Sequence, residues 1–319
     1  MKNIDQISQI KDNHANKILA LPGVNAIGLG YIGGQQNEEN IGIIVYLDDP
    51  TEPHQVPETL EGIEVEIREG HFSSPFATLT EQEPSQPPAA AKPKTGLGNP
   101  RDVEFEPMIG GIGVNPDFFY FSSWSGTLGL AIWDKNKNAV ILSNRHVICG
   151  KKPVVGDGVS QPVYEFLSHL AARLVAWNQG DITYQGKKYG IDAAIALPTN
   201  NRKASVGKIY GLPDVAGTAT AILGMNVTKS GLTTNVTTGT VTGINVDCIE
   251  KDSAIVMSNQ IIIKSSTTGS FSESGDSGSA VIEIGTNKVT GLLWGGNEKL
   301  KETMCSPIEA VLDYFECTI

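Results

Sequence analysis

The chain is poor in cysteine, in aromatic residues and in long apolar runs. Four cysteines occur in 319 residues, and none has the spacing of a metal site: Cys149, Cys248, Cys305 and Cys317. We therefore predict neither a disulfide framework nor a bound metal or other cofactor. No stretch reaches the roughly twenty apolar residues of a membrane span, and the N-terminus lacks an apolar core of signal-peptide length. These absences favour a cytoplasmic protein that makes no membrane contact.

Basic charge is also scarce. The chain has 24 Lys and Arg against 35 Asp and Glu, a formal net charge of −11. Residues 1–70 hold 4 basic and 12 acidic side chains, whereas residues 108–319 are nearly neutral with 17 and 18. Binding along a nucleic-acid backbone needs clustered Lys and Arg. This composition therefore argues against nucleic acid as a partner.

Length and apolar pattern predict a small domain at the N-terminus. The chain is too long for one ordinary domain. Apolar positions at intervals of three and four predict an amphipathic helix over residues 4–20, and apolar or alternating stretches predict strands at 24–31, 41–47 and 63–67. Residues 1–72 are thus expected to form a small α+β domain.

The composition changes after residue 72. Residues 73–107 are rich in Pro, Ala, Glu and Thr, which predicts an extended linker. Strand and turn patterns then fill residues 108–319, and this larger part is expected to be mainly β. Near its end, Ser306-Pro307 followed by Glu309 predicts a C-terminal helix that Ser306 caps.

A glycine-punctuated loop is the strongest sign of chemistry. Residues 274–279 read Ser-Gly-Asp-Ser-Gly-Ser and place Ser277 in a tight turn. Upstream, an apolar strand ends just before His146, and Asp192 opens another apolar run. A neutral imidazole is the usual base that activates a serine hydroxyl, and a buried carboxylate needs a partner such as an imidazole N–H. Each residue alone could be structural, but the order His146, Asp192, Ser277 predicts a catalytic triad.

These motifs together resemble the trypsin/chymotrypsin-like serine peptidases. Arg-His-Val at 145–147, Asp-Ala-Ala-Ile at 192–195 and Gly-Asp-Ser-Gly-Ser at 275–279 carry the resemblance. Gly-Thr-Leu-Gly at 126–129 and Lys-Ser-Gly-Leu-Thr-Thr at 229–234 resemble, more closely, a branch of trypsin-like proteins found in bacteria and plants. The resemblance covers about residues 108–319 and implies a chymotrypsin-like double β-barrel with the active site between the barrels. Small domains precede the peptidase in such relatives.

The resemblance also implies a serine endopeptidase that hydrolyses protein or peptide substrates through an acyl-enzyme. Backbone N–H groups of Gly275 and Ser277 would then hold the oxyanion. The positions that match the family's substrate pocket are Phe271 at the floor and Trp294 and Gly295 along a wall. Because no acid stands at Phe271, a small or apolar residue is expected before the scissile bond rather than a basic one. A homo-oligomer stays open.

Three alternatives also stay open. Asp181 could serve as the acid instead of Asp192, although its surroundings are polar. The triad could be intact but unused in a binding or scaffold protein on the same fold. A cut before Ile109 could free an amine that pairs with Asp276, whereas in an uncut chain a cation or backbone amides are expected to pair with Asp276.

Overall fold

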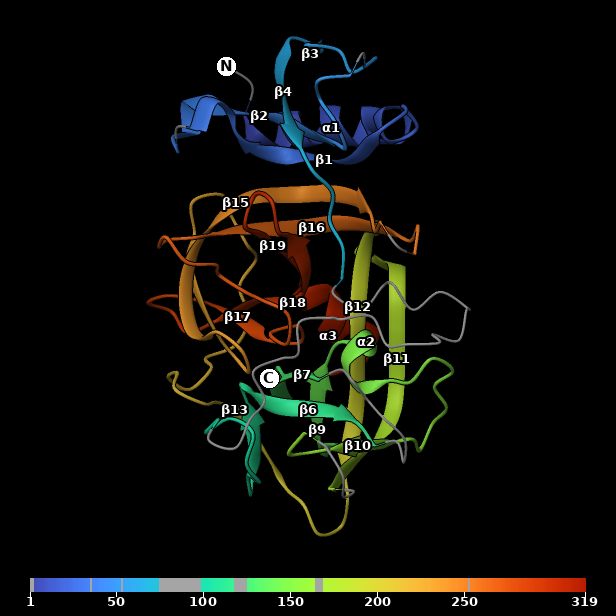
Figure 1. The fold of residues 1–319 in the computed structure, drawn as a ribbon, viewed down its shortest axis with the longest axis vertical. Coiled ribbons are helices and arrows are strands. Elements are labelled where there is room, and N and C mark those ends of the chain that lie inside the picture. Colours follow the sequence, from blue (N-terminus) through green and yellow to red (C-terminus); the bar gives the residue numbers. More distant parts are fainter. Residues whose placement is uncertain are drawn as a thin grey trace.

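Two β-barrels make up most of the chain, and a layer of one helix and four strands covers one end of the second barrel (Figure 1). The computed structural model describes residues 3–34, 36–52, 54–74, 99–117, 125–163, 169–251 and 253–319. Most of the expected linker, residues 75–98, lies outside these ranges. Residues 99–107 pack on the barrels, with Arg101 buried and its guanidinium 4.7 Å from the ring centre of Tyr210.

The first barrel is built from a seven-stranded sheet in the order β7-β6-β10-β11-β12-β9-β8. Its strands are β6 (Ile112–Pro116), β7 (Gly126–Leu128), β8 (Leu130–Trp133), β9 (Ala139–Ser143), β10 (Gly158–Ser160), β11 (Leu170–Tyr184) and β12 (Lys187–Pro198). A two-residue turn joins the two longest strands, with φ of 48° at Gln185 and 77° at Gly186. Positive φ at both central residues is typical of turns whose twist matches a hairpin. The short helix α2 (Arg145–Ile148) follows β9, and β5 (Met108–Gly110) pairs in parallel with β13 (Ala204–Ile209).

The second barrel is closed by six strands. They are β14 (Asn226–Gly231), β15 (Asn235–Ile249), β16 (Val256–Ser265), β17 (Ala280–Glu283), β18 (Val289–Asn297) and β19 (Glu302–Pro307). The order is β14-β17-β18-β19-β16-β15, and pairing of β15 with β14 completes the ring. The mainly β, chymotrypsin-like double barrel predicted from the sequence is confirmed.

The predicted C-terminal helix is present as α3 (Ile308–Tyr314). Its N-cap residue is Pro307, and no side chain caps the helix. Ser306, the predicted cap, instead lies buried in the barrel with its hydroxyl 3.3 Å from Gln260 Oε1. The strand β19 runs directly into the helix, so Ser306 is still part of the sheet and cannot turn back to the first helical N–H groups.

The N-terminal layer contains the predicted helix and strands. It consists of α1 (Ile4–Leu19), β1 (Val24–Tyr31), the 3₁₀ turns η1 (Ile32–Gly34) and η2 (Glu38–Asn40), β2 (Ile41–Leu47), β3 (Thr59–Leu60) and β4 (Ile63–Glu69). A capping box between Asn3 and Gln6 begins α1, which buries Ile7, Ile10 and Ile18 over the strands. The apolar side of the helix thus covers the apolar face of this small sheet.

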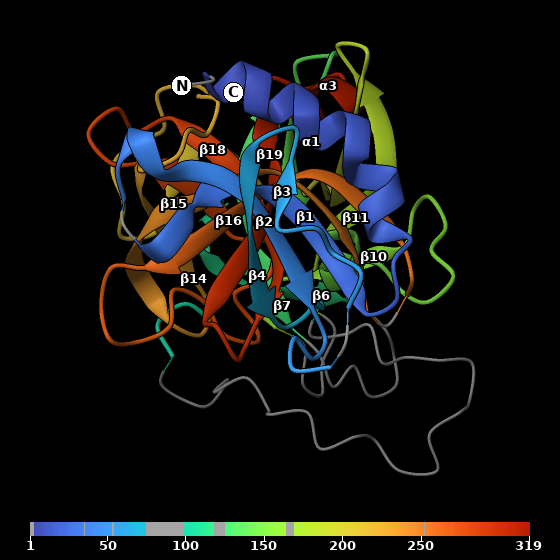
Figure 2. The same cartoon turned by 90° about the horizontal axis from the view of Figure 1, so that it is seen from above.

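This layer is joined to the second barrel through a continuous sheet. β1 pairs antiparallel with β15, from Ala26 opposite Cys248 to Gly30 opposite Gly243. Seen from above, α1 and strands β1, β2 and β4 lie across the barrel strands (Figure 2). The completely buried Lys11 crosses the seam and donates to Asp247 at 2.8 Å. The N-terminal region therefore extends the barrel sheet.

We expect the layer and the second barrel to unfold together, because they share one sheet. Ile27 is fully buried in β1, and Ile27→Ala should lower the free energy of unfolding by about 2–5 kcal/mol. Trp133, Trp177 and Trp294 lie on the barrel strands β8, β11 and β18, and Trp294 also packs against Ala26 and Tyr46 of the layer, so Trp fluorescence reports on the barrels and on their contact with the layer. The urea midpoint measured by Trp fluorescence should fall with that measured by far-UV circular dichroism. Ile4→Ala at the exposed start of α1 is the control, and an unshifted fluorescence midpoint in Ile27→Ala would contradict the coupling.

Candidate active site

The structure brings His146 and Asp192 together in the first barrel. His146 lies on α2, just after β9, and Asp192 lies on β12, the neighbour of β9 in the sheet. The Asp192 Oδ2 atom is 2.5 Å from His146 Nδ1, and Oδ1 accepts the backbone N–H of His146 at 3.2 Å. Asn144 donates its side-chain amide to the Asp192 carbonyl at 2.6 Å. This pairing fixes the ring so that Nε2 is the nitrogen left to exchange a proton with a substrate or nucleophile.

Asp181, the alternative acid, lies elsewhere. Its carboxylate on β11 accepts the backbone N–H of Ser258 at 2.9 Å and the Ser258 hydroxyl at 2.8 Å. Both oxygens therefore hold the start of β16 in place. Among the described residues, Asp192 is the acid that contacts the imidazole of His146.

Ser277 lies on the facing edge of the second barrel, in the loop before β17. Its main chain is held by the first barrel, because Thr127 donates its N–H to the Ser277 carbonyl at 2.8 Å and its hydroxyl to the Gly275 carbonyl at 2.9 Å. Gly126 fits between the barrels: a Cβ there would lie 2.5 Å from Val147 Cγ2 and 2.9 Å from the Ser277 oxygen. The loop of Ser277 and the helix of His146 thus meet across the junction of the barrels.

Two peptide units of the Ser277 loop are held by hydrogen bonds to their carbonyl groups. The Ser274 carbonyl accepts the Thr233 hydroxyl at 2.7 Å, and the Asp276 carbonyl accepts the Ser279 hydroxyl at 2.6 Å. In a trans peptide the carbonyl and the following N–H point in opposite directions. The N–H groups of Gly275 and Ser277 therefore point away from these partners, and neither has an acceptor among the residues that the structure describes. Gly275 adopts this conformation at φ of 98°, which favours glycine.

A buried ion pair holds the loop from below. Asp276 is completely buried and accepts the N–H groups of Thr233 at 2.9 Å, Thr234 at 3.1 Å and Glu273 at 3.0 Å. Lys229 Nζ, also completely buried, lies 3.2 Å from Asp276 Oδ2. Burial lowers the pKa of Lys229, and the nearby charge of Asp276 opposes that shift. The intact chain therefore supplies both a cation and backbone amides to Asp276.

The segment that begins at Met108 is not available as a new N-terminus in this structure. Met108 is fully buried, and its N–H donates to the Lys203 carbonyl at 2.8 Å. Ile109 lies within β5 between Met108 and Gly110, which are both buried. In the uncut chain, Asp276 is paired with Lys229 and with backbone amides.

A second acid, Glu250, lies near Asp192 and His146 and was not expected from the sequence. Burial raises its pKa, the charge of Asp192 raises it further, and His146 lowers it. Glu250 accepts the backbone N–H of Ser74 at 3.3 Å and the side-chain amide of Gln179 at 3.3 Å. It follows β15 in an ordinary polar stretch, so no local pattern indicates its position.

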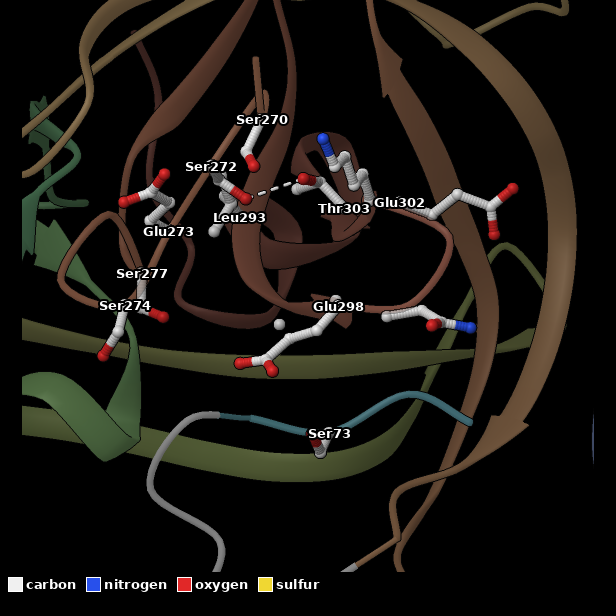
Figure 3. Close-up of a pocket in the computed structure, with 14 residues that line it drawn as sticks. Ser73, Ser270, Ser272, Glu273, Ser274, Ser277, Leu293, Glu298, Glu302 and Thr303 are labelled. Atoms are coloured by element: carbon white, nitrogen blue, oxygen red, sulfur yellow. Dashed lines mark hydrogen bonds between the residues drawn. The ribbon is translucent and has the colours of Figure 1, made fainter. Parts of the chain in front are cut away.

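A pocket of about 280 Å³ opens beside Ser277 (Figure 3). Most of the residues that line it are of polar type, although more of its surface is apolar than polar: Ser73, Ser270, Ser272, Glu273, Ser274, Ser277, Leu293, Gly295, Gly296, Asn297, Glu298, Lys301, Glu302 and Thr303. The hydroxyls of Ser272 and Thr303 are 2.6 Å apart, while Glu302 points away from Ser277. Tyr46 of the N-terminal layer donates to the Glu302 carboxylate at 3.0 Å.

Two of the three predicted pocket residues have side chains that face the core instead. Phe271 is fully buried in the second barrel, and its neighbour Ser272 lines the pocket. Trp294 is 1% exposed, and its Nε1 donates to Gln260 at 2.7 Å. Successive side chains of an extended segment point to opposite faces, so an error of one residue exchanges core for cleft. The assignments of Phe271 and Trp294 are therefore corrected, whereas Gly295 does line the pocket.

Comparison with known proteins finds a family model over part of the chain and several solved structures. A family model described as the Nal1 C-terminal domain matches residues 195–308. The chymotrypsin of Cellulomonas bogoriensis is 19% identical, with 66% of this chain and 97% of that chain covered and a TM-score of 0.45. A glutamic acid specific serine protease is 18% identical, with 66% and 100% covered and a TM-score of 0.48. A protease of M. tuberculosis, Rv3671c, is 15% identical, with 75% and 96% covered and a TM-score of 0.42.

No curated protein matches the chain. The chemistry of this chain therefore has to be argued from the site. Within the described ranges, no cluster of His, Cys, Asp and Glu is placed to hold a metal ion. No helix in the same ranges has the length and apolar character needed to cross a membrane.

The buried pair beneath the loop should contribute strongly to stability. Lys229→Met leaves the Asp276 carboxylate buried without its cation, which should cost about 3–5 kcal/mol in the free energy of unfolding measured with urea. Lys135→Met removes an exposed lysine from its pair with Glu316 and should leave the urea midpoint nearly unchanged. Equal effects of the two substitutions would contradict a special role for Lys229.

Proposed function

We propose that the protein is a serine endopeptidase in which His146, Asp192 and Ser277 form the catalytic triad. The proposal is supported by the bonded His146–Asp192 pair, which the close packing at Gly126 brings next to the Ser277 loop, and by the Gly275 and Ser277 N–H groups, which have no acceptor among the described residues. Donors placed where negative charge develops are the largest single contribution to catalysis in many acyl-transfer enzymes. A loop with no chemical role would not need both amides left without acceptors.

The first step is attack of Ser277 Oγ on a peptide carbonyl carbon. His146 Nε2 accepts the hydroxyl proton, and Asp192 stabilises the imidazolium through the bond to Nδ1. In the structure the Ser277 hydroxyl lies 3.4 Å from the Trp294 carbonyl, a long distance for a hydrogen bond between two oxygens. Rotation of the side chain toward the imidazole therefore costs little. The oxyanion that forms is held by the N–H groups of Gly275 and Ser277.

The second half of the reaction uses the same groups. The tetrahedral intermediate collapses, the C–N bond breaks, and His146 gives its proton to the leaving amine. Water then attacks the ester on Ser277 with His146 again as base, which releases a carboxylic acid and restores the hydroxyl. The nearby thiol of Cys149 does not compete as a nucleophile, because burial raises its pKa to about 12.

The pocket beside Ser277 supports a substrate preference. The hydroxyls of Ser272 and Thr303 and the main chain of Gly295 would surround the side chain that precedes the scissile bond. A small residue fits this lining, and the two hydroxyls could bond a side chain that accepts or donates a hydrogen bond. The preference for a small or apolar residue rather than a basic one stays a prediction.

A fluorophosphonate probe tests for the activated serine directly. We expect the intact chain to be labelled at one residue, with its uncut length verified by intact mass. Ser277→Ala should abolish labelling, and His146→Ala should slow it by at least about a thousandfold. Ser274→Ala, which removes a neighbouring pocket hydroxyl, should label normally. Absence of labelling at every pH would contradict the proposal and favour a binding or scaffold protein.

The identity of the acid can be tested by a matched pair. Asp192→Asn should slow labelling by about ten-thousandfold near neutral pH, because the amide holds the imidazole in the wrong tautomer. Asp181→Asn removes the same charge from β11 and should leave the labelling rate close to that of the parent. A large loss in Asp181→Asn with little loss in Asp192→Asn would overturn the assignment.

A further inference from the structure

Beyond Leu292, the edge of β18 that pairs with β17 has no further partner in β17. β17 pairs with β18 only as far as Ala280 opposite Leu292. Beyond that point, Gly278 donates its N–H to the Leu293 carbonyl at 2.8 Å, and the Trp294 carbonyl faces the Ser277 hydroxyl. An open strand edge offers N–H and carbonyl groups to an added peptide strand. This edge leads straight to Ser277.

The chain's own segment 72–74 occupies this edge. Ser73 donates its N–H to the Gly296 carbonyl at 3.1 Å, and Gly296 donates its N–H to the Ser73 carbonyl at 3.1 Å. This is an antiparallel bridge, so the chain that leaves Ser73 runs from Gly296 toward Trp294. A Cβ on Gly295 would lie 2.5 Å from the Ser73 oxygen, and the close approach therefore needs glycine there. Figure 3 shows Ser73 at the mouth of the pocket.

Contacts on both sides hold the segment in place. Phe72 is fully buried, its ring centre is 4.9 Å from that of Tyr46, and its carbonyl accepts the Lys251 N–H at 3.2 Å. Ser74 donates its N–H to Glu250 at 3.3 Å. Phe72 is therefore an anchor in the N-terminal layer, and the two residues after it are laid along the cleft.

We propose that the segment 72–74 is an intramolecular competitor of peptide substrates for the Gly296 edge of β18. The proposal rests on the proposed peptidase function, since it assigns this edge to the extended main chain of a substrate. A tethered segment has an effective concentration in the millimolar range, so a free peptide binds only in the fraction of molecules from which the segment has left. Extended peptides should therefore bind weakly to the intact chain until the segment is displaced.

Ser73→Pro tests the competition because it removes the N–H that binds Gly296 and leaves Gly296 itself intact. Ser73→Ala is the matched control, since it keeps both main-chain groups. Both are made in the full chain with Ser277→Ala, so that no peptide is cleaved. The probe is a fluorescein-labelled peptide with the sequence of residues 70–78, followed by fluorescence anisotropy. Ser73→Pro should bind it at least tenfold more tightly than Ser73→Ala, and equal affinities, or no binding to either, would overturn the proposal.

Hydrogen exchange at the Gly296 amide provides a second measurement that needs no ligand. Exchange should be slow in Ser73→Ala and at least tenfold faster in Ser73→Pro, with unchanged Trp fluorescence as the check of folding. Phe72→Ala, which withdraws the anchor, should give the same acceleration if Ser73→Pro does not fold. Slow exchange in the folded variants would overturn the proposal. If a fluorophosphonate labels the chain but Ser73→Pro does not change the peptide affinity, this inference fails and the peptidase function stands. If Ser73→Pro raises the peptide affinity but no labelling occurs, the segment covers a peptide-binding edge and the peptidase function fails.

Discussion

The buried carboxylate of Asp276 is the interaction on which the rest of the site depends. Three backbone N–H groups, the Thr234 hydroxyl and Lys229 converge on one side chain that has no exposure to solvent. Since an uncompensated charge at such a position is very costly, the loop is held to the one conformation that satisfies it. In that conformation the Gly275 and Ser277 amides have no acceptor among the described residues. The proposed role of Ser277 thus depends on an acid that is buried beneath its loop.

The cation that pairs with Asp276 determines whether the loop can form its conformation in the uncut chain. A cation that arrives only after chain cleavage would make the loop conditional on proteolysis. Here Lys229 is built into β14 and is in place as soon as the barrel closes. Under the proposed competition, control of the site acts at the strand edge at Gly296, where main-chain hydrogen bonds rather than a buried charge would decide what binds.

The sequence was sufficient for features whose signals are local. The helix at residues 4–19 and the strands β1 and β2 each appear as a local pattern. The short motifs around His146, Asp192 and Ser277 are also local, and their order along the chain joined them into one prediction. The position of Phe271 was not predictable in this way, because the face to which a strand residue points depends on a register that loop lengths obscure. The capping role of Ser306 failed for a related reason: tertiary pairing kept it in β19, where a local motif had predicted a helix start.

Features that join distant segments could not be predicted at all. The pairing of β1 with β15 and the bridge between Ser73 and Gly296 each connect residues more than two hundred positions apart. Their bonds are between main-chain groups, which every residue carries, so the side-chain sequence contains little record of the partner. They also have one consequence in common. The N-terminal layer shares a sheet with the second barrel, and this sheet fixes where Phe72 and Ser73 lie along β18. The position of the segment 72–74 therefore follows from the sheet rather than from the linker.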